Sequence, residues 1–315
     1  MFRVFSRIRP AGWWLLLGAA GFVAIPILMQ LLNVASSATI AYIVTPLLAV
    51  TLAILTRLAL GGQHDRMRHK SERALIIGSV MAIWFVGYFL SGLVVTYAHN
   101  AVASSWLAIL TNMAAFGLAA GSLEYVRHGI MLLAGRRNVL WFGIVVSFVF
   151  TGTQISLVQI MDIHTGVDMV KFGVSVLIPS LASSFLLTYL AFNAGLGPQL
   201  TYRLGLIAIL FVPPIIPRYD WYLIGIAWLL LSVAVYIAID RTRRDLAING
   251  RHYRHARRAY DVMFLGVVVI LAMFMVGVFT YAPQVIMSNS MKPVFSRGSM
   301  VIVQKVNPMD VKVGD

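Results

Sequence analysis

The sequence predicts a mainly α-helical membrane protein: a bundle of about nine transmembrane spans, followed by the first strands of an outer, β-rich domain. Of the 315 residues, 60% are hydrophobic and only 11% are charged, whereas a soluble domain typically has about 25% charged residues. The mean hydropathy is +0.85. Apolar runs of about 18 residues or more alternate with short polar stretches as far as residue 282, after which β-branched residues become frequent.

Each predicted span is an apolar run close to the roughly 20 residues that an α-helix needs to cross about 30 Å of hydrocarbon. The first run follows three arginines, as a signal peptide would. Its apolar part is too long for a signal peptide and has no small-residue cleavage site, so we expect it to be retained. The predicted spans are 11–33, 38–60, 75–98, 106–124, 139–160, 174–195, 200–217, 221–239 and 262–282.

The seventh predicted span is short and contains Pro213, Pro214 and Pro217. A re-entrant segment is therefore an alternative to a full crossing. Without a crossing here, the arginine-rich loop 240–261 and the end of the chain would exchange sides, against the positive-inside rule. We therefore expect this span to cross, with Arg203 extending its side chain to the membrane surface at one end.

The distribution of basic residues predicts the orientation. The net charge is +14, and lysine and arginine concentrate in the N-terminus and in every second loop. Positive loops are usually cytoplasmic, so we expect the N-terminus inside the cell and residues 284–315 on the outer face of the plasma membrane. Basic residues in short loops between spans indicate the lipid bilayer as a partner and do not indicate nucleic acid. The basic loops are 61–74, 125–138 and 240–261.

The pattern divides the chain into three regions. Residues 1–261 form a polytopic membrane region of about eight spans, residues 262–283 form a final transmembrane anchor, and residues 284–315 begin a β-rich domain. Within the last region, the run 300–306 is rich in β-branched residues and is predicted to be a strand. Roughly thirty residues cannot bury a core of their own, so we expect the β-rich domain to be incomplete in this chain.

Three short motifs follow the ninth predicted span. Residues 288–293, S-N-S-M-K-P, resemble the nucleophile box S-G-S-M-x-P of type I signal peptidases. Arg297 and Gly298, followed by the apolar run 300–303, resemble that family's R-G-D motif and strand, and residues 310–315, D-V-K-V-G-D, resemble its K-V-G-D box. The short spacing between the first and last motifs is closer to the endoplasmic-reticulum and archaeal type of the family. The resemblance is confined to this end of the chain.

The resemblance implies a membrane-bound serine endopeptidase that removes N-terminal signal peptides from exported preproteins. Ser290 would be the nucleophile and would form an acyl-enzyme once a base accepts its proton. Ser288 would contribute a hydroxyl to the oxyanion hole, beside the backbone N–H of Ser290. Met291 and Pro293 would shape the substrate cleft. Secretory preproteins are then the expected partners, together with the protein-translocation machinery, and no cofactor or metal is expected.

The motifs depart from the family pattern at several positions. Asn289 replaces a glycine, although asparagine tolerates a left-handed backbone, and Ser299 replaces the aspartate of R-G-D. The family's general base is a lysine or a histidine after a later strand. Lys305 and Lys312 are interpreted as surface residues. Because the chain ends within the third motif, we expect the base to lie beyond residue 315 and this chain to be inactive by itself.

Polar side chains near the predicted spans have two interpretations each. Glu124 ends the fourth predicted span near Arg127 and His128, and an ion pair at the membrane interface is favoured over a proton relay. A loop group of Asp162, His164 and Asp168 is interpreted as solvated and not as a metal site. Four amides within the spans are expected to hydrogen-bond between helices and not to line a transport path. They are Asn112, Gln154, Gln159 and Asn193.

Two other classes of function remain open. The large number of spans favours a transporter or channel with a vestigial peptidase-like tail, although we expect no span to carry a charge at its centre, as substrate paths often do. The basic loops suit a scaffold that binds the translocation machinery. The sequence has no cysteine, which excludes disulfides, thiolate metal sites and a cysteine nucleophile.

Overall fold

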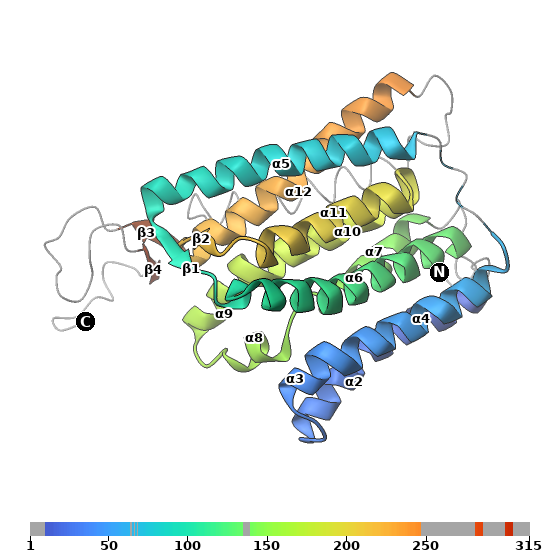
Figure 1. Cartoon of the computed structure of the whole chain (residues 1–315), viewed down its shortest axis with the longest axis horizontal. Helices are drawn as coiled ribbons and strands as arrows, with labels where there is room; N and C mark the ends of the chain where they lie inside the picture. Colours follow the sequence, from blue (N-terminus) through green and yellow to red (C-terminus); the bar gives the residue numbers. More distant parts are fainter. Residues whose placement is uncertain are drawn as a thin grey trace, which may run out of the picture.

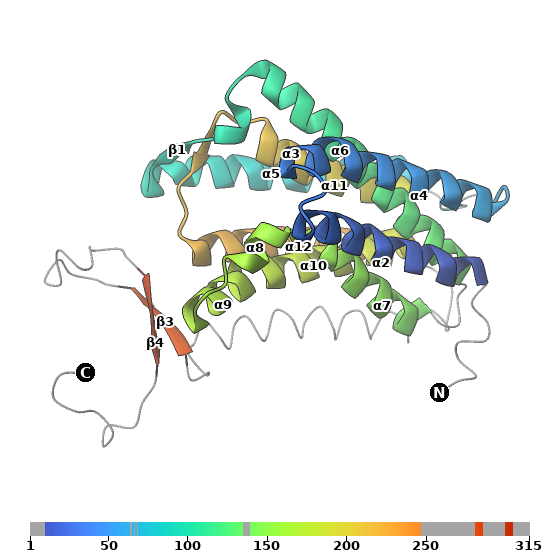
Figure 2. The same cartoon turned by 90° about the horizontal axis from the view of Figure 1, so that it is seen from below.

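A computed structural model describes residues 10–63, 65, 67, 69–134, 139–246, 281–285 and 300–304. Its long helices run back and forth along one axis, and two small antiparallel sheets accompany them (Figures 1 and 2). The helices are α2 (Pro10–Leu31), α3 (Ser37–Thr39), η1 (Ile40–Val44), α4 (Thr45–Leu60), α5 (Lys70–Val95), η2 (Ala101–Ala103), α6 (Trp106–Ala134), α7 (Val139–Gly152), α8 (Leu157–Met161), α9 (Gly166–Phe172), η3 (Gly173–Leu177), α10 (Ile178–Asn193), α11 (Leu196–Phe211) and α12 (Trp221–Leu246). The strands are β1 (Tyr97–His99), β2 (Ile215–Pro217), β3 (Tyr281–Val285) and β4 (Met300–Gln304).

Among the described residues, six helical segments are long and apolar enough to cross a membrane. The prediction of a mainly helical, multi-span membrane protein is therefore confirmed, whereas the number nine is not. The predicted spans 139–160 and 200–217 correspond to the shorter helices α7 and α11, and most of 262–282 lies outside the described residues. The six segments are Pro10–Leu31, Ser37–Leu60, Lys70–Val95, Trp106–Ala134, Gly166–Asn193 and Trp221–Arg241.

The outside of the bundle is apolar, as contact with lipid requires. Many large hydrophobic side chains on the long helices are exposed, including Trp14 at 72%, Ile83 at 74% and Leu93 at 75%. In water such a surface would cause association. Inside the bundle, α6 contacts α2, α4, α10 and α11, and α10 contacts α7 and α12. The two helices α6 and α10 therefore form the centre of the protein.

Prolines shape two of the spans. Pro46 is the second residue of α4, which follows the π-helical turn η1. Pro179 is the second residue of α10, which follows the π-helical turn η3. Proline has no N–H to donate to the preceding turn. Wide π-turns often occur at functional sites, and both of these turns border the cavity described below.

The loops after α5 and α11 are joined at one end of the bundle. β1 pairs antiparallel with β2, with Ala98 opposite Ile216. Helix α11 ends because Pro213 and Pro214 cannot continue it, and the buried Asn100 amide donates to the carbonyls of Leu210 and Pro213 at 2.9 and 2.8 Å. The predicted span 200–217 is thus wrong at its C-terminal end, where its last three residues form a strand.

The predicted span 139–160 is also too long. Helix α7 ends at Gly152, and the short helix α8 begins after a turn. Ser156 starts α8 as its N-cap: its hydroxyl accepts from the Gln159 N–H at 3.3 Å, and the Gln159 side chain accepts from the Ser156 N–H at 3.0 Å. This reciprocal capping satisfies backbone groups that would otherwise continue a helix. Gln159 therefore serves a local turn, and it makes no hydrogen bond to another helix in the described part of the chain, contrary to the prediction.

The second sheet lies at the end of the chain. β3 pairs antiparallel with β4, and Val285 lies opposite Met300. The predicted strand 300–306 is confirmed for Met300–Gln304. Tyr281 and Ala282 belong to β3, so their assignment to the ninth span was wrong.

We predict that Gly225→Ala destabilises the bundle. A Cβ at this position in α12 would lie 2.3 Å from the Val174 carbonyl oxygen and 3.2 Å from Cα of Ser175, both backbone atoms of η3. The helices must separate to accommodate it, at a cost of about 1–3 kcal/mol. A lower thermal unfolding temperature in detergent is the expected result. The matched control is Gly87→Ala in α5, where nothing lies within 4 Å of the added Cβ; equal melting of the two variants would contradict the prediction.

Candidate functional site

The serine motif lies outside the described residues, as do all four predicted site residues, Ser288, Ser290, Met291 and Pro293. The same holds for Lys305 and Lys312. The described strands flank this motif in the chain: β3 ends at Val285 and β4 begins at Met300. Residues 286–299 are therefore the connection between two paired antiparallel strands.

A different candidate site, built from polar side chains, lies among the described residues in the middle of the bundle. Glu124 and Arg127 form an ion pair, with 3.0 Å between Oε2 and Nε, and their side chains are 3% and 0% exposed. The prediction placed Glu124 at the end of a span ending at 124, but α6 continues to Ala134. The pair is an ion pair as expected, yet it is buried in the protein and does not face the membrane surface.

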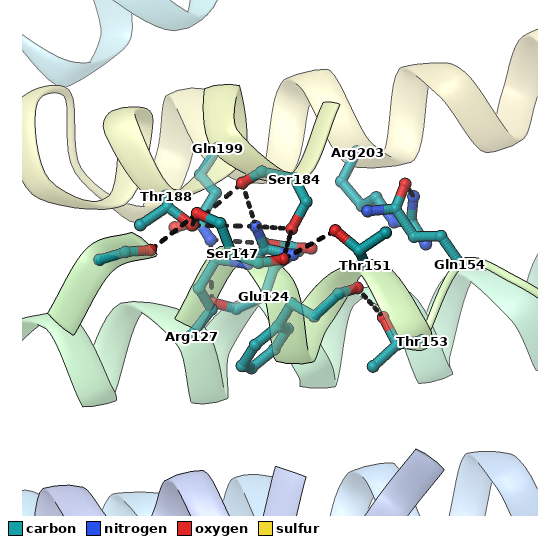
Figure 3. A network of polar contacts seen from close by, with 12 residues as sticks. Glu124, Arg127, Ser147, Thr151, Thr153, Gln154, Ser184, Thr188, Gln199 and Arg203 are labelled. Atoms are coloured by element: carbon teal, nitrogen blue, oxygen red, sulfur yellow. Dashed lines mark hydrogen bonds and ion pairs between the residues drawn. The ribbon is translucent and has the colours of Figure 1, made fainter. Parts of the chain in front are cut away.

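Three further helices surround this ion pair (Figure 3). From α11, the Gln199 amide donates to Glu124 Oε2 at 2.6 Å. From α10, the Ser184 carbonyl accepts from Arg127 Nη1 at 2.6 Å. From α7, the Phe150 ring lies 4.5 Å below the guanidinium, measured to its centroid. A buried ion pair with hydrogen-bonded neighbours avoids part of the cost of removing charge from water.

Hydroxyl groups connect α7 to α10 beside the ion pair. The Ser147 hydroxyl donates to Thr188 Oγ1 at 2.8 Å, and the Ser184 hydroxyl donates to the Ser147 carbonyl at 2.7 Å (Figure 3). All three side chains are buried. Hydrogen bonds of this kind hold helices together in a membrane, where water cannot compete for them.

A separate cluster of polar side chains, centred on Asp65, joins loops at the end of the bundle opposite β1 and β2. Asp65 accepts from the Met67 N–H at 2.8 Å and pairs with Lys70 at 3.1 Å and His128 at 3.5 Å. Burial would raise the pKa of the Asp65 carboxyl, but the Met67 N–H and the two basic side chains outweigh it and lower that pKa. Gly195, at φ +95°, permits this contact, because a Cβ there would lie 2.5 Å from Asp65 Oδ2. This group is structural: it fixes the ends of α4, α5, α6 and α10.

A cavity of about 740 Å³ lies beside the central ion pair. Its walls come from α2, α3, η1, the first residue of α4, α6, the segment 152–159, η3, α10, α11 and α12. In each long helix, most of the lining residues fall between its middle and the end nearest β1 and β2. The cavity therefore occupies the half of the bundle on that side. Its volume is in the usual range for small-molecule sites.

Arg203 is placed in this cavity, halfway along α11. Its Nη1 donates to Gln154 Oε1 at 3.1 Å. The expectation that Arg203 extends to the membrane surface is wrong, because seven residues of α11 precede it and eight follow. Charged side chains do lie within the helices: α6 contains Glu124 and Arg127, and α11 contains Arg203.

The other sequence-derived candidates have mixed outcomes. Asn112 does connect helical segments, because it accepts from the Tyr42 hydroxyl at 2.6 Å and donates to the Val102 carbonyl at 2.8 Å. Thr165 is the N-cap of α9, and Asp168 completes its capping box, accepting from the Thr165 N–H at 3.1 Å and from the Thr165 hydroxyl at 2.7 Å. Within the described ranges, no group of three histidine or acidic side chains is arranged to hold a metal ion.

The apolar exterior and the buried polar centre define a helical membrane protein. No protein-family model, curated protein or solved structure matches the chain. The signal-peptidase function that residues 285–315 suggest therefore stays a prediction.

Proposed function

We propose that this protein is a membrane-bound serine endopeptidase of the signal peptidase I type, with its reactive serine on the outer face of the plasma membrane. The observation that carries the proposal is the ordered set of three motifs in residues 288–315. Ser290 attacks the carbonyl carbon of the scissile bond, a general base accepts its proton, and the amine of the mature protein leaves with a proton. Water then hydrolyses the acyl-enzyme and releases the signal peptide.

Two features of the chain support this proposal. The serine motif lies in the sequence between β3 and β4, which pair with each other, as expected for the start of an outer β-rich domain. The apolar helices keep the protein in the bilayer, where the signal peptide of a secretory preprotein also resides. In this proposal the preprotein is the substrate, and the basic loops face the cytoplasmic side of the translocation machinery.

The test is signal-peptide release in membrane vesicles that carry the full-length gene product. The substrate is a preprotein with alanine at the −3 and −1 positions. We expect a mature product whose new N-terminus follows the second alanine, and no product in vesicles without the protein. Vesicles that contain the folded, inserted protein and release nothing would overturn the proposal.

The orientation gives a separate prediction. The native chain has no cysteine, so single cysteines can report each side. Gln63 follows α4 at one end of the bundle, and Ser104 precedes α6 at the other. We expect an impermeant maleimide to label Ser104→Cys and Ser290→Cys in intact cells, and Gln63→Cys only after permeabilisation. Labelling of Gln63→Cys alone in intact cells would reverse the proposed orientation.

A carrier function of the bundle is the second candidate. It is favoured by Arg203, a charge in a cavity at the middle of a helix, because charged residues inside membranes usually mark binding sites or transport paths. The two candidates concern different parts of the chain, so loss of cleavage in a Ser290 variant leaves the carrier candidate untouched.

A further inference from the structure

The cavity around Arg203 has a mainly apolar wall and a single charge. Among the described residues that line it, Arg203 is the only one with a charged side chain. Apolar walls come from α2, α6 and α11, and include Phe22, Phe116 and Phe211. Uncharged polar side chains also line it, and one of them, Gln154, accepts a hydrogen bond from the guanidinium. A site with a single charge and a mainly apolar wall suits a molecule that has one charged end and an apolar body.

The charge of Arg203 has no counter-ion of its own. No carboxylate lies within 4.0 Å of its guanidinium in the described part of the chain. Glu124 attracts both Arg127 and Arg203, but its contact at 3.0 Å is with Arg127. Two guanidinium groups therefore share one carboxylate, and the three groups together carry an excess of one positive charge.

Donor groups at the guanidinium also lack partners. The Nε atom of Arg203 and the amide nitrogen of Gln154 are buried, and neither has a hydrogen-bond partner among the described residues. Buried donors of this kind are usually satisfied. Because Gln154 already accepts from Arg203 through Oε1, its amide nitrogen is a second donor at the guanidinium that has no acceptor among the described residues. Both groups donate, so the missing partner is an acceptor.

The position of Arg203 along its helix makes this unpaired charge costly. Arg203 lies roughly 11 Å from the start of α11 and roughly 12 Å from its end, at 1.5 Å per residue. A charged side chain in the middle of an apolar helix is expensive unless it is paired or solvated. The two π-turns η1 and η3, which also border the cavity, widen the backbone where a ligand would lie, as π-turns at functional sites often do.

We propose that this cavity binds an amphiphilic organic anion, with a carboxylate or phosphate head on Arg203 and Gln154 and an apolar body against the aromatic wall. The guanidinium fork matches both head groups, since each offers two oxygens to parallel N–H donors. This binding does not depend on the peptidase reaction, so Ser290→Ala leaves it unchanged.

The test is equilibrium binding of radiolabelled dodecanoate to the full chain, purified in a neutral detergent. We expect dodecyl phosphate to compete with dodecanoate, and dodecanol, which has the same chain without the charge, to compete at least about 10-fold more weakly. Inorganic phosphate, the head group alone, is expected to compete only weakly. Competition by dodecanol as strong as that by dodecyl phosphate would overturn the anion site, and full competition by inorganic phosphate at the same concentration would overturn the role of the apolar wall.

Variants locate the site within the chain. Arg203→Gln removes the charge and should weaken dodecanoate binding by about 10- to 100-fold, the effect of losing a charge-assisted hydrogen bond. The folded protein without ligand should melt at the same or a higher temperature, since an unpaired buried charge has been removed. Arg57→Gln, at an exposed arginine near the end of α4, is the matched control and should bind normally.

A second variant keeps the proposal testable if Arg203→Gln does not fold. Gln154→Leu removes the neighbouring amide and leaves every charge in place, and we expect it to weaken binding by about 3- to 10-fold. Unchanged dodecanoate affinity in a folded Arg203→Gln, or in Gln154→Leu, would overturn the site.

Discussion

Ser290→Ala is expected to reduce signal-peptide release to the level of vesicles without the protein. Its expression and membrane insertion should be unchanged, because the substitution removes one hydroxyl oxygen and alters none of the predicted spans. Without that oxygen no acyl-enzyme can form. The measurement is release from a preprotein with alanine at −3 and −1, followed over time in vesicles that contain equal amounts of each variant.

Two neighbouring serines serve as controls for this prediction. Ser288→Ala should slow release by on the order of 10²- to 10³-fold, the usual effect of losing one oxyanion-hole donor. Ser299→Ala should have little effect, because the G-S-M sequence at 298–300 is followed by Val301 and not by a proline-containing turn. Full activity of Ser290→Ala together with loss in Ser299→Ala would mean that the motif is assigned to the wrong serine. Full activity in all three variants would contradict a serine peptidase mechanism at this motif.

Hydropathy was a good guide to the existence of the helices and a poor guide to their ends. Apolar length predicts a span because backbone polar groups in lipid must be satisfied within the helix. The ends depend on side-chain hydrogen bonds that hydropathy does not measure. Ser156 and Gln159 start α8 inside an apolar run, and Asn100 closes the end of α11 from more than a hundred residues away in the sequence. The predicted span 106–124 ends ten residues before α6 does, because Glu124, Arg127 and His128 suggested a membrane surface. These side chains are instead buried by partners from α7, α10 and α11 and by Asp65.

The central polar site was only partly visible in the sequence. Glu124 and Arg127 stand three residues apart on one helix face, so their ion pair was predictable. The hydroxyl groups of Ser184 and Thr188 also share a face, at a spacing of four, but nothing in one sequence says which helix that face meets. Arg203 was interpreted as a surface residue because arginines near span ends usually reach the interface. Its true position follows from where α11 begins, after the positive-φ turn at Gly195.

Arg127→Met is expected to destabilise the bundle by about 3–5 kcal/mol, the usual cost of leaving one member of a buried ion pair alone. Glu124 would remain buried, with Gln199 as its hydrogen-bonding neighbour, and the Ser184 carbonyl would lose its bond of 2.6 Å. The measurement is the free energy of unfolding in mixed detergent micelles, with the fraction of unfolded protein followed as the denaturing detergent is increased. Arg57→Met, at an exposed arginine of α4, is the control and should change this free energy by no more than about 0.5 kcal/mol.

A double variant separates the buried charge from the loss of packing. Methionine at both Glu124 and Arg127 removes the two charges together, so neither is left without a partner. Because replacing a complete buried ion pair with apolar side chains is often neutral or stabilising, the double variant should be more stable than Arg127→Met alone, although it has lost more polar contacts. The comparison isolates the ion pair, since both variants keep a long, unbranched side chain against the Phe150 ring. The contrary outcome is that the losses in the free energy of unfolding caused by Glu124→Met and by Arg127→Met simply add up in the double variant. That result would mean that the pair contributes no coupling energy and that packing around Arg127 holds α6, α7 and α10 together.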